Sequence, residues 1–146
     1  MTADATPTDD TSIDPRVARS FDAQGLMTHL GARLVAAGDG RCTIEAPMAP
    51  PLTQQDGFFH AGVTASLADT AAGYAAYTRM AAGERVLTIE FKLNLLRPAA
   101  GTRLRAEARV LRSGRQLTVV EATARVARDG AWHECARFLG TMMALR

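Results

Sequence analysis

The stretch GFFHAGVTASLADTAAGYAAY, residues 57–77, decides the fold, because it holds the only long helical pattern in the body of the chain. Apolar side chains surround the predicted helix, residues 61–80, on all sides, and a helix that is apolar all round is a buried one. Gly83 is expected to end it. Asp69 has no basic residue three or four positions away, where a helical ion pair would lie. Asp69 therefore faces water, forms an interaction with a residue elsewhere in the fold, or has a catalytic role.

Shorter patterns flank this helix. Before it, two strands are predicted to form a hairpin across a Gly-Asp-Gly turn, at residues 32–36 and 41–46. After it, four strands are predicted, at residues 87–95, 103–110, 116–128 and 132–144. In residues 87–95 the odd positions are apolar and the even positions are polar, which is the period of a strand with one buried face. A tight turn at Asp129-Gly130 indicates that the last two strands form a hairpin.

The N-terminal part is predicted to differ from the rest. Residues 1–14 are expected to form a disordered acidic leader, and residues 15–146 a single domain. Asp14 and Pro15 have the chemistry of a helix start, so one or two short helices should follow, reaching about residue 30. The leader lacks the basic and apolar regions of a signal peptide, so the cytoplasm is the expected location.

The order of elements predicts an α+β fold. Two strands, one long buried helix and four strands joined by short turns are best packed as an antiparallel sheet of five to six strands wrapped around the helix. Such a sheet has edges, and an edge strand invites pairing with a second copy. A dimer with a continuous sheet is therefore expected.

Composition narrows the classes of function. No apolar run approaches the roughly 20 residues that cross a bilayer, so no membrane association is expected. Cys42 and Cys135 do not have the spacing of metal ligands or of a redox pair, and the three histidines are scattered, so no metal is expected.

Charge points to a phosphorylated partner. Residues 1–15 contain four acids and no base, so the rest of the chain holds 17 basic and 11 acidic residues. Six arginines lie between residues 97 and 115, which suits a nucleic acid or a nucleotide-bearing cofactor. Aromatic residues form only 5% of the chain and none lies in that segment. The shortage of stacking side chains disfavours nucleic acid as the partner.

Residues 54–73 resemble the PaaI-like (phenylacetate-degradation type) acyl-CoA thioesterases, a family with the hotdog fold. The family pattern is Asn or Gln, then HGG six residues later, then an acid nine residues after the His. Gln54, His60 and Asp69 keep both spacings. Ala61 stands in place of the first glycine of HGG and Gly62 is the second. The similarity continues through residues 67–73 and 87–99, and it covers roughly residues 25–146.

The resemblance implies a role for each residue of the motif. Asp69 would act as general base on water or as a nucleophile that forms a mixed anhydride, and both remain open. The backbone N–H of Ala61, at the positive end of the helix dipole, would donate to the thioester carbonyl oxygen. Gln54 would hold the water or assist at the carbonyl. His60 would touch the thioester or brace its loop. Thr88 would help to position the nucleophilic water, as a Ser or Thr does in the family, although it lies one residue further from the acid than usual. Alternatively, Thr88 is a polar strand residue that faces solvent.

Residues on the substrate side follow from the same resemblance. Arg97, Arg112 and Arg115 are candidates for the phosphates of coenzyme A. Phe59 and Gly73 are assigned to the substrate-binding surface. Four residues are expected either to line a pocket for an aryl or medium-chain acyl group or to pack in the core: Phe58, Phe59, Tyr74 and Met80. Arg103, Arg105 and Arg109 are expected on a solvated sheet face. Coenzyme A is part of the substrate, so no separate cofactor is expected.

Two other functions compete with acyl-CoA hydrolysis. A hotdog enoyl-CoA hydratase or dehydratase would use a His/acid pair, which His60 and Asp69 superficially supply, although their spacing matches the thioesterases. A non-catalytic acyl-CoA-binding module would need no acid to activate water. The resemblance also implies that Asp69 and Thr88 come from one subunit and Gln54 and Ala61 from the other. A dimer is then required for activity, and tetramers built as dimers of dimers are common in the family.

Overall fold

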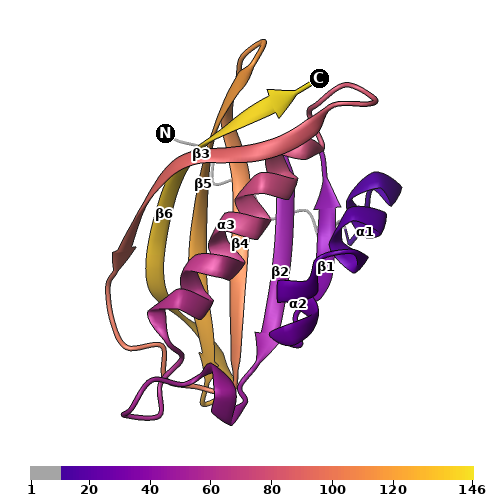
Figure 1. Ribbon diagram of the computed structural model, residues 1–146. Helices are drawn as coiled ribbons and strands as arrows, with labels where there is room; N and C mark the ends of the chain where they lie inside the picture. Colours follow the sequence, from indigo (N-terminus) through magenta and orange to yellow (C-terminus); the bar gives the residue numbers. More distant parts are fainter. Residues whose placement is uncertain (1–10) are drawn as a thin grey trace.

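The computed structural model describes residues 11–146 (Figure 1). Residues 1–10 of the expected leader lie outside the described residues. The rest of that segment is attached to the domain: the Asp14 N–H donates to the Ala37 carbonyl at 2.7 Å, and the Ala37 N–H donates to the Ser12 carbonyl at 3.0 Å.

Two short helices follow, α1 (Pro15–Asp22) and α2 (Gly25–His29), as predicted. The Asp14 side chain accepts a hydrogen bond from the Arg16 N–H and caps α1, and Pro15 occupies the first helical position. Val17 and Phe21 are buried. The Phe21 ring lies 6.2 Å from that of Tyr74 on the long helix, which fixes α1 against the core.

The long helix α3 (Ala61–Tyr77) begins at the predicted residue and ends three residues earlier than predicted. The end is set by Thr78, whose hydroxyl donates to the Ala75 carbonyl at 2.7 Å and accepts from the Gly40 N–H at 2.8 Å. Thr78 thus ties the helix end to the turn between the first two strands. Gly83, with φ of +86°, lies in the following turn instead of ending the helix.

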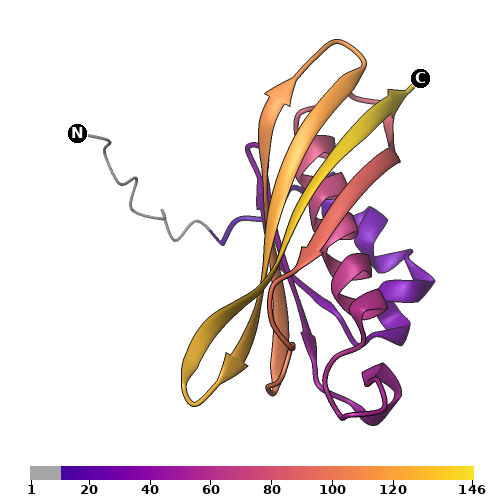
Figure 2. The same ribbon diagram turned by 90° about the vertical axis from the view of Figure 1, so that its left-hand side faces the viewer.

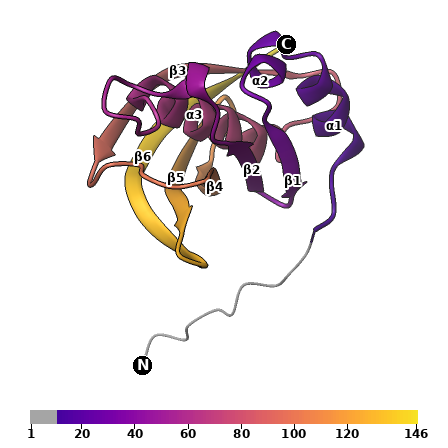
Figure 3. The same ribbon diagram turned by 90° about the horizontal axis from the view of Figure 1, so that it is seen from below.

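Six strands form one antiparallel sheet in the order β1-β2-β4-β5-β6-β3 (Figure 1). Their bounds are β1 (Arg33–Gly38), β2 (Arg41–Pro47), β3 (Arg85–Leu95), β4 (Arg103–Ser113), β5 (Leu117–Arg128) and β6 (Ala131–Leu145). A short 3₁₀ helix, η1 (Pro50–Leu52), precedes α3. The sheet curves around α3, and α1 and α2 lie on the same side of it (Figure 2, Figure 3). The predicted α+β fold is confirmed.

The predicted alternation holds in the strands behind the helix. In β5 the even-numbered residues from 118 to 126 are buried against α3 and the odd-numbered ones are more exposed. The β5–β6 turn uses Asp129 and Gly130 with φ of 51° and 74°, the left-handed geometry that this hairpin turn requires. The helix α3 contacts β4, and the buried side chains of both elements include several alanines, which permits close packing of the helix on the sheet.

Strand β3 departs from the predicted alternation. It pairs Thr88 with Met142 and Glu90 with Thr141, which leaves Ile89 as an extra residue in a bulge. The prediction that the odd positions share one face is therefore wrong at Leu87, which pairs with Met143 and lies on the outer face. Thr88 faces inward, towards α3. Because β3 is an edge strand, its apolar residues Leu87, Ile89, Phe91 and Leu95 are 43 to 56% exposed.

Candidate active site

Asp69 is half-buried in the middle of α3, on the side that faces β3. Its Oδ1 accepts a hydrogen bond from the Thr88 hydroxyl at 2.8 Å, and its Oδ2 has no partner among residues 11–146. Burial raises the pKa of the Asp69 carboxyl, and the hydrogen bond from Thr88 opposes this only in part. The result is a carboxylate with one free oxygen and an increased affinity for a proton.

The bulge in β3 brings Thr88 to this position. With strict alternation from Phe91 backwards, residue 88 would lie on the outer face; the extra residue Ile89 turns it inward. The Thr88 oxygen also lies 3.2 Å from the Met142 sulfur. A hydroxyl has one proton, so the charged carboxylate takes it and the sulfur only packs against the oxygen.

A cleft of about 410 Å³ opens at the N-terminal end of α3. Its lining residues are Gln54, Phe58, Phe59, Ala61, Thr64, Leu95, Leu96, Arg97, Pro98, Ala99 and Cys135. Most of these side chains are apolar, as in pockets that enclose small organic ligands. The predicted residues Phe59 and Arg97 thus meet Gln54 and Ala61 here.

The helix start leaves one donor free in this cleft. His60 is the N-cap of α3, and its Nδ1 accepts from the Gly62 N–H at 2.8 Å. His60 therefore braces the turn, one of its two expected roles. Gly62 leaves room for this imidazole, since a Cβ at position 62 would lie 3.0 Å from that Nδ1 and would require the ring to shift. The Ala61 N–H donates to no group of residues 11–146, and Ala61 does not adopt a positive φ. Alanine thus replaces glycine without backbone strain.

Gln54 has one half of its amide engaged. The Oε1 accepts from the Asp56 N–H at 2.6 Å and the Phe58 N–H at 3.2 Å, which closes the loop before α3. The Nε2 group makes no hydrogen bond within the described part of the chain. It remains a free donor on the cleft wall.

The structure does not bring the two halves of the predicted site together within one protomer. Ala61 and Asp69 are eight residues apart on α3, about 12 Å along its axis at 1.5 Å per residue. His60 and Asp69 are further apart still, and no hydrogen bond joins them. A His/acid pair of the kind a hydratase uses does not form in the protomer.

The predicted coenzyme A arginines are separated as well. Arg97 follows the end of β3 and lies on the cleft. Arg112 and Arg115 lie at the opposite end of the sheet, around the β4–β5 turn. On β6, residue 136 pairs with Leu95 near the cleft and residue 143 pairs with Leu117 near the β4–β5 turn. These two positions are roughly 23 Å apart along the strand. Within one protomer, Arg97 and the other two arginines cannot bind the same phosphates.

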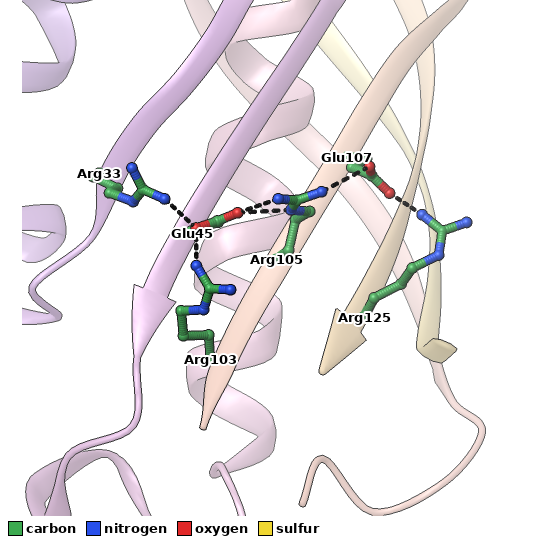
Figure 4. A network of polar contacts seen from close by, with 6 residues as sticks. All are labelled: Arg33, Glu45, Arg103, Arg105, Glu107 and Arg125. Carbon is green, nitrogen blue, oxygen red and sulfur yellow. Dashed lines mark hydrogen bonds and ion pairs between the residues drawn. The ribbon is translucent and has the colours of Figure 1, made fainter. Parts of the chain in front are cut away.

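Arg103 and Arg105 belong to a network on the outer face of the sheet, as expected for a solvated face (Figure 4). Its centre is Glu45, which the sequence analysis did not single out. Glu45 is 1% exposed and pairs with Arg33 at 2.7 Å, Arg103 at 3.5 Å and Arg105. The sequence did contain a signal for this network: an acid lies within the alternating pattern of one predicted strand, and another predicted strand is rich in arginine.

The remaining pocket candidates divide into two groups. Phe58 and Phe59 line the cleft, whereas Tyr74 and Met80 pack in the core, so of the two expected roles these two residues have the core one. The Tyr74 hydroxyl is hydrogen-bonded to Gln24 at 2.7 Å, which holds it away from the cleft. Gly73, one turn after Asp69, is buried but has free space where a Cβ would be.

No cluster of three possible metal ligands occurs within residues 11–146. Cys42 and Cys135 are buried free thiols. Burial raises the pKa of the Cys135 thiol to about 11, so it is not a nucleophile at neutral pH. Among the described residues, no helix has the length and apolar character needed to cross a membrane.

Comparison with known proteins identifies the family. A family model described as the thioesterase superfamily matches residues 56–132. The crystal structure of a thioesterase family protein from Silicibacter pomeroyi is 45% identical, with a TM-score of 0.88, over 89% of this chain and 96% of that one. The relative named "Putative esterase VNG_1336C", from Halobacterium salinarum, is 34% identical over 75% of this chain and 76% of its own length.

The E. coli PaaI protein of the phenylacetic acid degradation operon is only 21% identical. It shares the fold, with a TM-score of 0.79 over 90% of this chain and 92% of that one. A family model that spans more than half of the chain and a solved thioesterase at 45% identity together establish the relationship. The chain therefore belongs to the thioesterase superfamily, and it has the hotdog fold that it shares with the E. coli PaaI protein.

Proposed function

We propose that the protein is an acyl-CoA thioesterase, which hydrolyses a thioester to a free acid and coenzyme A. The observation that carries the proposal is the state of Asp69. It is an acid in an otherwise apolar helix, without a basic partner, held by one hydroxyl and with its other oxygen free. Such a group is costly for stability, and its surroundings favour proton uptake, which suits a general base.

In the hydrolytic step, the free Oδ2 of Asp69 takes a proton from water and the water oxygen attacks the carbonyl carbon. The carbon–sulfur bond then breaks, its electron pair stays on sulfur, and the proton passes to the thiolate. Alternatively, Asp69 itself attacks the carbon and the carbon–sulfur bond breaks, which gives a mixed anhydride and the coenzyme A thiolate. Water then hydrolyses the anhydride to the free acid and the Asp69 carboxylate, and a proton of the water passes to the thiolate. The Thr88 hydroxyl fixes the carboxylate in either route.

Charge on the carbonyl oxygen needs donors that are free before substrate arrives. The Ala61 N–H, at the positive end of α3, and the Nε2 of Gln54 are two such donors on one cleft. We assign the carbonyl oxygen to the Ala61 N–H. Arg97, at the same cleft, is the first candidate for a phosphate of coenzyme A.

A second copy of the chain is needed to complete this site. The roughly 12 Å between Ala61 and Asp69 along α3 is too long for one thioester to contact both in one protomer. The exposed apolar residues of edge strand β3 supply a surface on which two copies can pair. The proposed active unit is therefore at least a homodimer. Arg112 and Arg115 can serve the same substrate only from another protomer.

The test is an assay of thiol release on short, medium, long and aromatic acyl-CoAs, with the wild type beside Asp69→Asn. Asparagine keeps the size of the side chain and an acceptor for Thr88 but cannot act as a base. We expect a loss of about 10²-fold or more in kcat. Unchanged turnover would place the chemistry elsewhere, and binding without turnover would favour an acyl-CoA-binding module.

A single-turnover reaction in H₂¹⁸O separates the two routes, since label enters Asp69 only after an anhydride has formed. Mixing Asp69→Asn with Ala61→Pro, which removes the N–H, tests the shared site. Each variant alone is expected to be impaired. A mixed dimer regains one intact site, so the mixture should recover activity if two copies form the site.

A further inference from the structure

Thr64 is a buried polar residue on the floor of the cleft, and nothing in the proposed chemistry uses it. It lies one turn after Ala61 on α3, and it is 1% exposed. Its hydroxyl forms no hydrogen bond with any group of residues 11–146. A buried hydroxyl that is left unpaired costs free energy, so this position calls for an explanation.

The Thr64 hydroxyl opens into the cleft. Every fully covered side-chain nitrogen or oxygen in the described part of the chain has a hydrogen-bond partner. The Thr64 oxygen has none, so it keeps a small accessible surface. Thr64 lines the cleft, and that is where a buried residue of α3 can reach a ligand.

The other polar groups of the cleft lie nearer its rim. Gln54 is partly exposed and Arg97 is exposed, whereas the floor is formed by Phe59, Ala99 and Cys135, each at most 8% exposed. The Cys135 thiol lies 3.4 Å from the Ala124 carbonyl and is engaged there. Among the described residues of this floor, Thr64 therefore offers the one unengaged polar side-chain group.

The position on α3 indicates which part of a substrate meets Thr64. Residues three apart share a helix face, so Thr64 lies below Ala61, where the proposed function places the thioester carbonyl. The proposed function assigns Arg97, at the rim of the cleft, to coenzyme A, which leaves the floor for the acyl chain. Thr64 is five residues before Asp69, about 140° around the helix, so its hydroxyl does not share the face of the carboxylate.

We propose that Thr64 is a specificity-determining residue that hydrogen-bonds an oxygen substituent, a hydroxyl or an oxo group, on the acyl chain. The cleft then selects oxygenated acyl groups over the corresponding hydrocarbon chains. This inference rests on the proposed thioesterase function. Thr64 stands beside an otherwise apolar floor, so an oxygen placed there is bound only when the hydroxyl is present.

The experiment compares acyl-CoAs that differ by one oxygen: 3-hydroxyhexanoyl-CoA with hexanoyl-CoA, and 4-hydroxyphenylacetyl-CoA with phenylacetyl-CoA. We expect the wild type to favour the oxygenated member of at least one pair, in kcat/KM, by about 10-fold. Thr64→Val has the same shape without the hydroxyl and should remove that preference. Thr64→Ser should retain it. The pair for which the preference depends on Thr64 shows whether the cleft binds an aliphatic or an aromatic acyl group.

Thr118→Val is the matched control, because Thr118 is a buried threonine of β5 outside the cleft. It should leave the preference unchanged. The proposal is overturned if the wild type shows no preference in either pair, or if Thr64→Val slows both members equally. The same pairs, made as non-hydrolysable thioethers, are used in binding titrations. A Thr64-dependent binding preference without any turnover would sink the proposed function and leave this inference standing.

Discussion

Asp69 and Glu45 are both acids that the fold covers, Asp69 in part and Glu45 almost completely, and their neighbours differ in kind. Glu45, on the outer face of β2, is surrounded by the guanidinium groups of Arg33, Arg103 and Arg105. Asp69, on α3, has only the hydroxyl of Thr88.

Burial acts to raise the pKa of both side chains. For Glu45, the hydrogen bonds from Arg105 and Arg33 outweigh burial, and its pKa is lowered. For Asp69, burial prevails over the single bond from Thr88, and its pKa is raised. The comparison shows that the neighbours, more than burial, decide whether a covered acid is a fixed charge or a base. A covered acid without a cation is the one to examine for chemistry.

The largest effect is expected on the stability of the fold when Glu45 loses its charge. Glu45→Gln leaves three arginines without their shared counter-charge, and we expect the free energy of unfolding to fall by roughly 2–4 kcal/mol. Urea denaturation at pH 7 measures it. Glu121→Gln is the control, because Glu121 has a single arginine partner and lies partly exposed, so about 1 kcal/mol or less should be lost. Equal losses in the two variants would refute the special role of the network.

The pH dependence of this effect has a definite sign. The folded-state pKa of Glu45 lies below its unfolded value, so its stabilisation is complete above the unfolded pKa and is lost as pH falls through the folded one. The difference in unfolding free energy between wild type and Glu45→Gln should therefore shrink on acidification below about pH 4.5. A difference that stays constant down to pH 3 would contradict the lowered pKa.

Thr88→Val tests how the single hydrogen bond to Asp69 affects its pKa and the rate of reaction. Removing the one donor to the Asp69 carboxylate should raise its pKa further and free the side chain to rotate. We expect kcat to fall about 10-fold and the acid limb of the pH–rate profile to move to higher pH. Thr88→Ser keeps the hydroxyl and should keep the limb near its wild-type position. A limb that does not move in Thr88→Val would show that another group titrates.

The extent to which the sequence predicted this site differs between its parts. The buried helix, the hairpins and the strand pattern were predictable because side-chain period and turn chemistry act locally. The inward turn of Thr88 was not, because it depends on one extra residue, Ile89, in the pairing of β3 with β6. The ion pairs of Glu45 were missed because Glu45 and its arginine partners lie on three different strands, β1, β2 and β4, which only the sheet order brings together.

A smaller effect, of opposite sign to that of Glu45→Gln, is expected for the stability of Asp69→Asn. Because the folded-state pKa of Asp69 is raised, ionising it costs stability, and that cost appears as pH rises from the unfolded value through the folded one. The variant should be more stable than the wild type at pH 7, by less than about 1 kcal/mol since the carboxylate still reaches solvent. Thermal unfolding at pH 7 and pH 3.5 tests this, and a gain of similar size at both would contradict the mechanism.

The smallest effect is expected at Ala61, where this chain departs from the glycine of related motifs. Ala61 lines the cleft and has a negative φ, so glycine there relieves no strain and removes only a methyl group. Since the donating N–H remains, Ala61→Gly should keep kcat on short acyl-CoAs within about 3-fold and lower KM only for bulky chains. Gly62→Ala is the contrast, because its methyl would press on the His60 nitrogen and disturb the helix start for every substrate. If Ala61→Gly instead slowed all chain lengths alike, the methyl would be holding the donor in place, and the oxyanion role would depend on the side chain as well as on the backbone.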